Sequence, residues 1–127
     1  MRRLFSILLM LSAGIVSAQE FDFGAKTKVT LLVNPAVAKA DSTIEVGLRL
    51  EMPAGWHTYW RNPGDNGTPT TIKWTLPKGV TAGDIQWPVP EKVEWLEMFT
   101  YAYHHEVPLI IPLTLADDLK SGKYDLK

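Results

Sequence analysis

The sequence predicts an all-β fold, and three observations support this prediction. Nine prolines are spread through the 127 residues, so few uninterrupted windows remain in which an amphipathic helix could form. The stretch from Thr43 to Met52 alternates apolar and mainly charged residues, which is the pattern of a strand with one wet face. Turn signals recur about every ten residues, a spacing typical of a β-sandwich.

The remaining elements follow from the same reasoning. We expect an apolar strand at Val107–Leu115 that lies at a sheet edge or carries bulges, because Pro108 and Pro112 each remove a ladder donor. One helical turn is expected at Ala116–Lys120. The other predicted strands are Lys28–Val33, Thr43–Met52, Trp56–Arg61, Thr70–Leu76, Phe99–Tyr103 and a last one that begins at Tyr124–Lys127.

Tryptophan supplies much of the expected core. Trp56, Trp60 and Trp74 occupy alternating strand positions and are predicted to fill the interior of the sandwich. Trp87 and Trp95 border prolines or charges, so we expect them to be more exposed. A row of exposed rings would instead suit a carbohydrate-binding module, and exposure therefore separates the two interpretations.

Both ends of the chain carry information. Residues 1–18 have the pattern of a secretory signal peptide: a short basic start, an apolar run at Leu4–Val16 that is too short to span a bilayer, and cleavage after Ala18. Residues 19–127 then form one exported domain. The last predicted strand has only begun at Lys127, so we expect this domain to be truncated at its C-terminus.

Composition limits the possible functions. The net charge is −1, which gives no electrostatic case for binding nucleic acid. Cysteine is absent, so these 127 residues cannot carry out thiol chemistry by themselves. A nucleophile elbow and a glycine-rich phosphate loop are also missing, and no cofactor is implied.

Three histidines raise the alternative of a metal site. Neighbouring residues of a strand point to opposite faces, so His104 and His105 do not easily share one ion. A copper or zinc site would need His57 or a carboxylate to complete it. Solvated histidines are the favoured interpretation, and we predict no metal site.

The loop from Asn62 to Pro69 is rigid by composition. Its first four residues suit a tight turn, because proline fixes φ at the second position and glycine tolerates positive φ at the third. An Asn-Gly pair then gives a second turn signal. Such a loop limits the unfolded chain, and the residues alone favour a well-built connection between two aromatic strands.

Three runs of residues carry a family resemblance. They read GWHTYWRNPGDNGTPTTIKWTLPKGV, IQWPVPEK and YAYHHEVPLIIPLTL. From about Val46 to Lys127 the chain resembles the N-terminal periplasmic domain of the DsbD-type thiol:disulfide interchange proteins, in the branch that includes the copper-sensitivity suppressor ScsB. The motif residues are Trp56, His57, Tyr59, Trp60, Asn62, Pro63, Gly64, Asp65, Trp87 and Pro88.

The resemblance implies a fold, a location and an activity. The fold would be an immunoglobulin-like β-sandwich in the periplasm, followed in the parent protein by a membrane-embedded electron-transfer domain and a thioredoxin-like domain. Electrons would pass through the membrane to this outer domain, which would then reduce disulfide-bonded periplasmic proteins. The family's cysteine pair would lie just beyond Tyr124–Lys127, so this fragment alone is expected to be inactive. The alternative is a non-redox secreted β-sandwich that binds a protein, a carbohydrate or copper.

The resemblance also implies a cap over the cysteine pair. Residues 98–103 occupy the place of the family's cap loop, and Phe99, Tyr101 and Tyr103 are the candidate rings. A ring over two thiols would exclude water and stray thiols. Packing of these rings in the core is the competing interpretation, because side chains alternate along a strand.

Overall fold

The computed structural model describes residues 27–127, and the predicted signal peptide lies outside them. The strands are β1 (Lys28–Leu32), β2 (Ser42–Glu51), β3 (His57–Gly64), β4 (Val80–Ala82), β5 (Glu91–Trp95), β6 (Met98–His104) and β7 (Glu106–Leu115). A short 3-10 turn, η1 (Pro35–Val37), precedes β2. The predicted all-β class is confirmed. No helix among residues 27–127 has the length and apolar character needed to cross a membrane.

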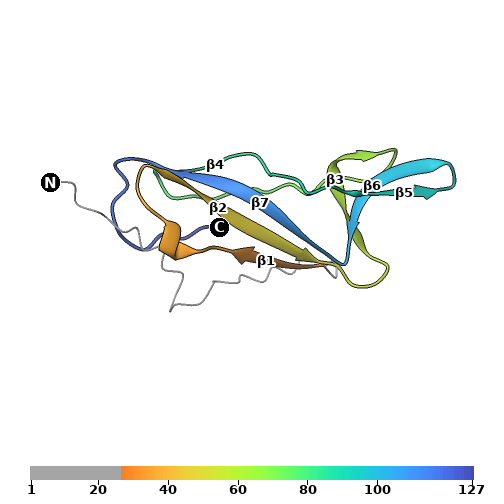
Figure 1. The fold of residues 1–127 in the computed structure, drawn as a ribbon, viewed down its shortest axis with the longest axis horizontal. Coiled ribbons are helices and arrows are strands. Elements are labelled where there is room, and N and C mark those ends of the chain that lie inside the picture. Colours follow the sequence, from red (N-terminus) through yellow and green to blue (C-terminus); the bar gives the residue numbers. More distant parts are fainter. Residues whose placement is uncertain (1–26) are drawn as a thin grey trace.

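The strands form two antiparallel sheets that build a sandwich-like fold (Figure 1). The four-stranded sheet has the order β1-β2-β7-β4, and the three-stranded sheet has the order β3-β6-β5. In Figure 1 the three-stranded sheet lies at the right-hand end of an elongated molecule. The chain passes from β6 to β7, and so from one sheet to the other, at His105, which has a φ of 66°.

Strand β2 forms as its alternation predicts. Ile44, Val46 and Leu50 are at most 3% exposed, whereas the residues between them are exposed or half-buried. The strand pairs with β7 along its whole length, from Ser42 opposite Leu115 to Glu51 opposite Glu106. The two strands thereby bring their apolar residues to one side of the sheet. On β7 these are Val107, Leu109, Ile111, Leu113 and Leu115.

The prediction of an edge strand at Val107–Leu115 is wrong, because β7 lies between β2 and β4. The carbonyl groups of Ile110 and Pro112 accept hydrogen bonds from Gln86 and Gly83, so the even-numbered residues turn their backbone polar groups away from β2. The missing N–H groups of Pro108 and Pro112 would therefore point away from β2, toward the side of β7 that the short strand β4 only partly covers. A central strand tolerates proline there because no ladder bond is lost.

The core is covered on its second side by irregular chain as much as by strands. The half-buried residues that pack on it from the segments around β4 include Ile72, Trp74, Leu76, Ile85 and Trp87. The prediction of a strand at Thr70–Leu76 is wrong: its residues alternate between half-buried and exposed, but within 27–127 only Thr75 has a backbone hydrogen-bond partner. The periodicity thus gave the correct inward face without a neighbouring strand.

The segment after β7 completes the core. The helical turn predicted at Ala116–Lys120 is instead a β-turn, closed by a 3.2 Å hydrogen bond from the Leu119 N–H to the Ala116 carbonyl. Leu119 is 8% exposed and Leu126 is 1% exposed, so both side chains belong to the core. The C-terminal residues are therefore packed into the fold.

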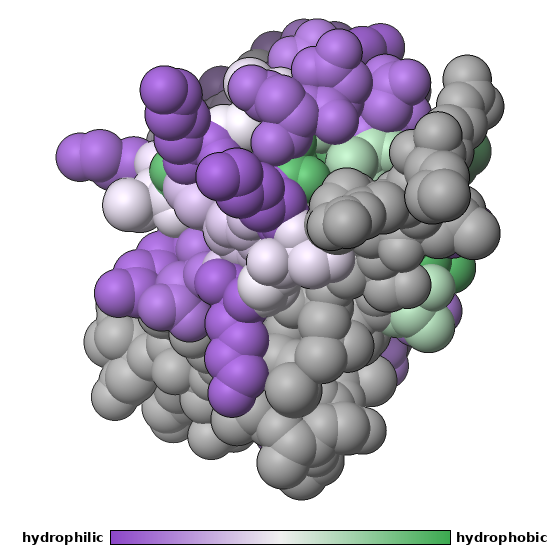
Figure 2. All heavy atoms as spheres, turned by 90° about the vertical axis from the view of Figure 1, so that its left-hand side faces the viewer, coloured by the Kyte–Doolittle hydropathy of each residue, from purple (hydrophilic) through white to green (hydrophobic). Residues whose placement is uncertain are grey.

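The two ends of the molecule differ in polarity. Figure 2 views the end where β2 begins and β7 ends, and most of the described residues on this face are hydrophilic. Charged, exposed residues flank these strand ends, including Lys39, Asp41, Asp117, Asp118 and Lys120. The opposite end carries most of the exposed large apolar residues, Val37 of η1 excepted, and the candidate site.

Candidate functional site

The β5–β6 hairpin ends in an apolar tip, formed by Trp95, Leu96, Met98 and Phe99. The turn residues Leu96 and Glu97 have φ values of 50° and 64°, and Trp95 pairs with Met98 beside them. Two residues with positive φ match the twist of a two-residue hairpin, for which Asn-Gly is the usual sequence. Trp95 is 68% exposed and Leu96 is 71% exposed. The hairpin therefore holds large apolar side chains in solvent.

The three candidate cap rings lie on one face of β6 in three different environments. Phe99 is 37% exposed, and the Lys92 Nζ atom lies 4.2 Å from the centre of its ring. Tyr101 is half-buried, and its ring meets Trp60 edge-on at 5.6 Å between centroids. Tyr103 is 5% exposed and belongs to the core cluster. Exposure thus rises from Tyr103 toward the apolar tip.

Tyr103 also explains the run around Trp87 and Pro88. Its hydroxyl donates a 2.7 Å hydrogen bond to the Pro88 carbonyl, while Trp87 packs against the core. The expectation that Trp87 is exposed is therefore wrong. Burial raises the pKa of the Tyr103 hydroxyl above 10.0, and the positive charge of Arg61 partly opposes this rise.

The loop predicted at Asn62–Pro69 begins later than expected, because β3 continues to Gly64, and the segment docks onto β6. Asp65 donates its backbone N–H to the Phe99 carbonyl at 2.9 Å, and its carboxylate accepts the Phe99 N–H at 2.8 Å. Gly64 has a φ of 90°, and a Cβ at this position would lie 2.5 Å from the same Phe99 carbonyl oxygen. Only glycine allows the two backbones to approach this closely. We call this pair of hydrogen bonds the Asp65–Phe99 clamp.

The same loop covers the ring of Tyr59. A Cβ on Gly67 would lie 2.3 Å from that ring, and Gly67 has a φ of 103°. Between Tyr59 and Gly64 the register of β3 against β6 shifts, so the strand bulges where the loop leaves it. The glycines of the motif are thus required by close packing of the loop on both strands.

The opposite face of the three-stranded sheet carries polar rings. His57 and Tyr59 lie 3.0 Å apart from Nε2 to the hydroxyl, and the His57 and His104 ring centroids are 5.5 Å apart. His104 Nδ1 is 2.7 Å from Glu91 Oε2. His57 and His104 therefore meet, as a completed metal site would require. However, residues 27–127 contain no group of three or more His, Cys, Asp or Glu side chains placed to hold a metal ion.

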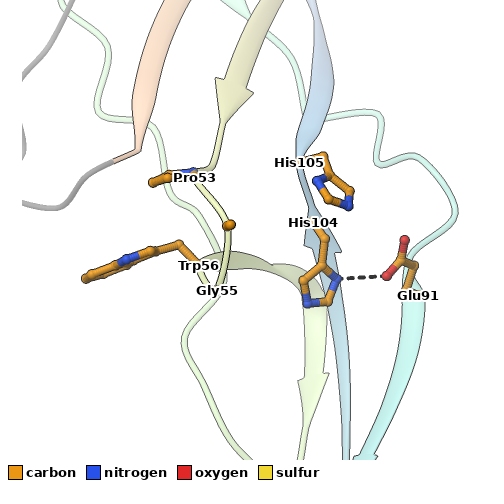
Figure 3. A pocket seen from close by; sticks show the side chains of 7 residues that line it. Pro53, Gly55, Trp56, Glu91, His104 and His105 are labelled. Carbon is orange, nitrogen blue, oxygen red and sulfur yellow. Dashed lines mark hydrogen bonds and ion pairs between the residues drawn. The ribbon is translucent and has the colours of Figure 1, made fainter.

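Two concave pockets flank these histidines. One, of about 350 Å³, runs along the outer face of the sheet and is lined by His57, Tyr59, Asn66, Val93, Trp95, Thr100, Ala102 and His104. The other, of about 220 Å³, lies at the β2–β3 turn and includes Pro53, Glu91 and His105 (Figure 3). Figure 3 shows His104 turned toward Glu91, with Trp56 pointing away from both.

The division of the tryptophans into core and exposed residues differs from the prediction. Trp60 and Trp74 pack against the core as predicted, and Trp95 is exposed as expected. The prediction that Trp56 fills the core is wrong, because this side chain is 45% exposed. Trp56 closes the β2–β3 turn by donating its backbone N–H to the Pro53 carbonyl, so it precedes β3 and does not share the inward face of that strand.

Comparison with protein families decides the relationship. The family described as thiol:disulfide interchange protein DsbD, N-terminal, matches residues 27–127. The chain belongs to the DsbD N-terminal family. The resemblance inferred from the sequence motifs is thereby confirmed, and no curated protein sequence gives a significant match.

A solved structure agrees with the fold of the DsbD N-terminal family. The crystal structure of the N-terminal periplasmic domain of ScsB from Proteus mirabilis matches with a TM-score of 0.59 and 22% sequence identity. The match covers 84% of this chain and 46% of the ScsB domain. The predicted immunoglobulin-like sandwich is confirmed, and the chain spans less than half the length of the solved domain.

Two features of this DsbD N-terminal domain were missed from the sequence. Leu96 was not considered a site residue, although an apolar pair inside the charged run around residues 94–97 was a readable sign of a special turn. The Asp65–Phe99 clamp joins residues 34 positions apart, and no local pattern indicates such a contact.

Proposed function

We propose that this chain is the outer, periplasmic domain of a thiol:disulfide interchange protein that reduces disulfides in periplasmic partner proteins. The match of the DsbD N-terminal family to residues 27–127 carries the proposal. Because these residues contain no cysteine, the redox pair is assigned to residues that follow Lys127 in the parent protein. Residues 1–18 direct export and are removed after Ala18.

The chemistry is two successive thiol–disulfide exchanges. A thiolate of the pair attacks a sulfur of the partner's disulfide, forming a mixed disulfide and releasing the partner's other sulfur as a thiolate. The second cysteine then attacks the mixed disulfide, which leaves the domain oxidised and the partner with two thiols. A membrane electron-transfer domain and a thioredoxin-like domain of the same parent protein supply the two electrons that reduce the cysteine pair again.

The apolar tip is the proposed cap over the cysteine pair. Phe99 is favoured among the three candidate rings, because it is exposed and its backbone is fixed by the Asp65–Phe99 clamp. Leu96 extends the exposed apolar surface at the turn, whereas Trp95 lies on the opposite face of the hairpin, beside the 350 Å³ pocket. Tyr101 is half-buried against Trp60, and Tyr103 is too deeply packed to move over a thiol.

The test starts from the parent gene. A cysteine pair is expected soon after Lys127, and its absence would contradict the redox proposal. Replacing the second cysteine by serine in the parent protein should trap a mixed disulfide with a disulfide-bonded periplasmic protein, visible on a non-reducing gel. The variant without either cysteine is the matched control and should trap nothing. Mass spectrometry of the exported protein tests whether the chain begins at Gln19.

The second candidate is a binding module without redox activity. It is favoured by the 350 Å³ pocket, in which the exposed Trp95 ring lies beside polar groups of Asn66 and His57. Flat rings and amide groups suit a carbohydrate. Titration of the cysteine-free parent protein with oligosaccharides, followed by tryptophan fluorescence, separates the two: saturable binding supports the module, and an unchanged spectrum removes it.

A further inference from the structure

Strand β5 forms an exposed edge of the three-stranded sheet. The order β3-β6-β5 places it there, and within residues 27–127 no backbone hydrogen bond reaches β5 from the side away from β6 (Figure 1). Its side chains are exposed apart from the half-buried Val93. An edge of this kind can pair with a further strand, so its backbone and its charges decide what it accepts.

The hairpin register shows which backbone groups of β5 point outward. Glu94 lies opposite Phe99 in the β5–β6 ladder. The N–H and the carbonyl of Phe99 are both bonded to Asp65, which follows β3 on the other side of β6, so Glu94 and Phe99 form a non-hydrogen-bonded pair. Because this orientation alternates along a strand, the backbone groups of Lys92 and Glu94 point outward, and those of Val93 point toward β6.

The charged and apolar side chains of this edge lie on different faces of the sheet. Lys92 shares the face of the Phe99 ring, with its Nζ atom 4.2 Å from the ring centre, and by alternation Glu94 lies on the same face. Val93 and Trp95 lie on the opposite face, where both line the 350 Å³ pocket. One face therefore carries a cation and an anion two residues apart, and the other carries an apolar pair.

Two copies of this edge are complementary in one antiparallel register. When Val93 lies opposite Val93 of a second copy, Lys92 lies opposite Glu94 of that copy, and the reverse pair forms by symmetry. Sliding one strand by two residues in either direction brings Lys92 opposite Lys92 or Glu94 opposite Glu94, which is destabilising. Charges usually protect an edge strand from pairing, but here their alternating sign leaves one register favourable.

We propose that the parent protein forms a two-fold symmetric dimer in which β5 pairs with β5 of a second copy. Each pair of Lys92 with Glu94 exchanges two backbone hydrogen bonds and sets opposite charges directly opposite each other. The occupant of the edge is a second copy, because the pattern of charge is complementary to itself, as a two-fold interface requires. The two three-stranded sheets thereby join into one continuous sheet.

The dimer also changes the surroundings of the pocket. Trp95 is 68% exposed, and in the proposed register it lies opposite Glu91 of the second copy and diagonally beside Val93 of that copy. Glu91 is the residue whose carboxylate lies 2.7 Å from His104 Nδ1. The pockets of the two copies therefore meet at the two-fold axis, with an exposed tryptophan ring of each copy covered by the other.

The first test is a disulfide crosslink in the parent protein, with every natural cysteine replaced by serine. Val93→Cys places two thiols in the central non-hydrogen-bonded pair, where a Cα–Cα distance of about 4.5 Å permits a disulfide. Val89→Cys is the matched control, because this exposed residue and its copy would lie about 25 Å apart at about 3.3 Å per residue. Oxidation should give a covalent dimer with Val93→Cys and not with Val89→Cys.

Linkage of both variants, or of neither, would overturn the proposal. Any other occupant of the edge counts among the contradicting outcomes. An extended segment of a different protein, or residues of the parent protein after Lys127, would cover β5 and leave Val93→Cys unlinked.

A charge exchange provides a second measurement that leaves Val93 in place. Lys92→Glu and Glu94→Lys, each alone, set like charges opposite each other and should weaken dimerisation of the parent protein several-fold in analytical ultracentrifugation. The double variant restores opposite charges and should restore the dimer. A parent protein that stays monomeric, single variants that dimerise normally, or a double variant no better than the single ones would overturn the proposal. Since neither experiment measures thiol chemistry, the proposed redox function is tested separately.

Discussion

Asp65 and Phe99 hold each other through two hydrogen bonds, one from backbone to backbone and one from backbone to carboxylate. The loop that follows β3 is thereby attached to the strand that follows the apolar tip. A motif that looks like a tight turn in the sequence is therefore a tether in the structure. Its effect is to fix the backbone of Phe99 while leaving the ring partly exposed.

Removing the carboxylate should loosen this tether. Asp65→Ala is expected to cost about 1 kcal/mol of unfolding free energy, since one hydrogen bond is lost and the Phe99 N–H can turn to water. Hydrogen exchange at the Phe99 amide should accelerate. Asp118→Ala, in the exposed turn after β7, is the control and should change neither quantity. An unaltered Phe99 exchange rate in Asp65→Ala would contradict the tether.

Two glycines of positive φ should respond differently to alanine. Gly67→Ala places a Cβ against the Tyr59 ring, so it combines backbone strain with overlap and is expected to cost about 2–4 kcal/mol. Gly55→Ala has a φ of 84° but open space around it, so only the backbone cost of about 1 kcal/mol applies. Chemical denaturation measures both. Equal losses would mean that the loop does not pack on Tyr59.

The Tyr103 hydroxyl should contribute measurably to stability. Tyr103→Phe removes its bond to the Pro88 carbonyl and is expected to cost about 1 kcal/mol. Tyr101→Phe is the matched control, because the Tyr101 hydroxyl has no hydrogen-bond partner in the described part of the chain. A thermal melt of the two variants should separate them. Coincident melts would place the Tyr103 hydroxyl outside the stabilising network.

The same residue predicts a loss of stability in alkali. The folded state raises the pKa of Tyr103, so above pH 10 the unfolded chain loses its proton first and binds fewer protons than the folded chain. The stabilisation is complete below pH 10.0 and declines as the pH rises through the folded-state value. Tyr103→Phe should flatten this decline in unfolding free energy. An identical alkaline decline in the variant would assign it to other groups.

The cap proposal predicts faster oxidation when the apolar tip is trimmed. In the parent protein, Phe99→Ala and Leu96→Ala should each speed the oxidation of the reduced cysteine pair by a small disulfide several-fold, because access to the thiols increases. Tyr101→Ala should have a smaller effect, since its ring lies against Trp60. Val89→Ala, an exposed apolar residue in the Pro-rich segment before β5, is the control. Unchanged rates in both tip variants would remove the cap role.

Alternating sequence predicted strands at β1, β2, β3, β6 and β7, but it missed the short strand β4 and the charged strand β5. Ile44, Val46 and Leu50 are buried as predicted, because β2 lies between β1 and β7 and one face is covered. The segment Thr70–Leu76 has the same periodicity without a ladder, since hydrogen bonding depends on a partner that its own residues do not specify. The two prolines of β7 led to the wrong prediction of an edge strand, because the sequence does not reveal toward which neighbour the backbone N–H of each residue points.

The candidate site was less predictable than the fold. The motif residues around Trp60 and Asp65 were recognisable, but their contacts with Tyr101 and Phe99 cross from one strand to another and have no local signature. Trp56 was misassigned because alternation was extended one residue beyond the start of β3. The pairing of His57 with His104 depends on the β3–β6 register, which only the fold supplies.

The turn at Leu96 and Glu97 sets stability against the proposed cap function. Each non-glycine residue in this left-handed conformation costs roughly 1–2 kcal/mol, which an Asn-Gly turn would avoid. Replacing Leu96 and Glu97 with Asn-Gly would give a more stable protein, but the hairpin turn would lose its exposed leucine side chain and become polar. Attempts to stabilise this domain for practical use should therefore leave that hairpin untouched and begin with the hydrophilic end.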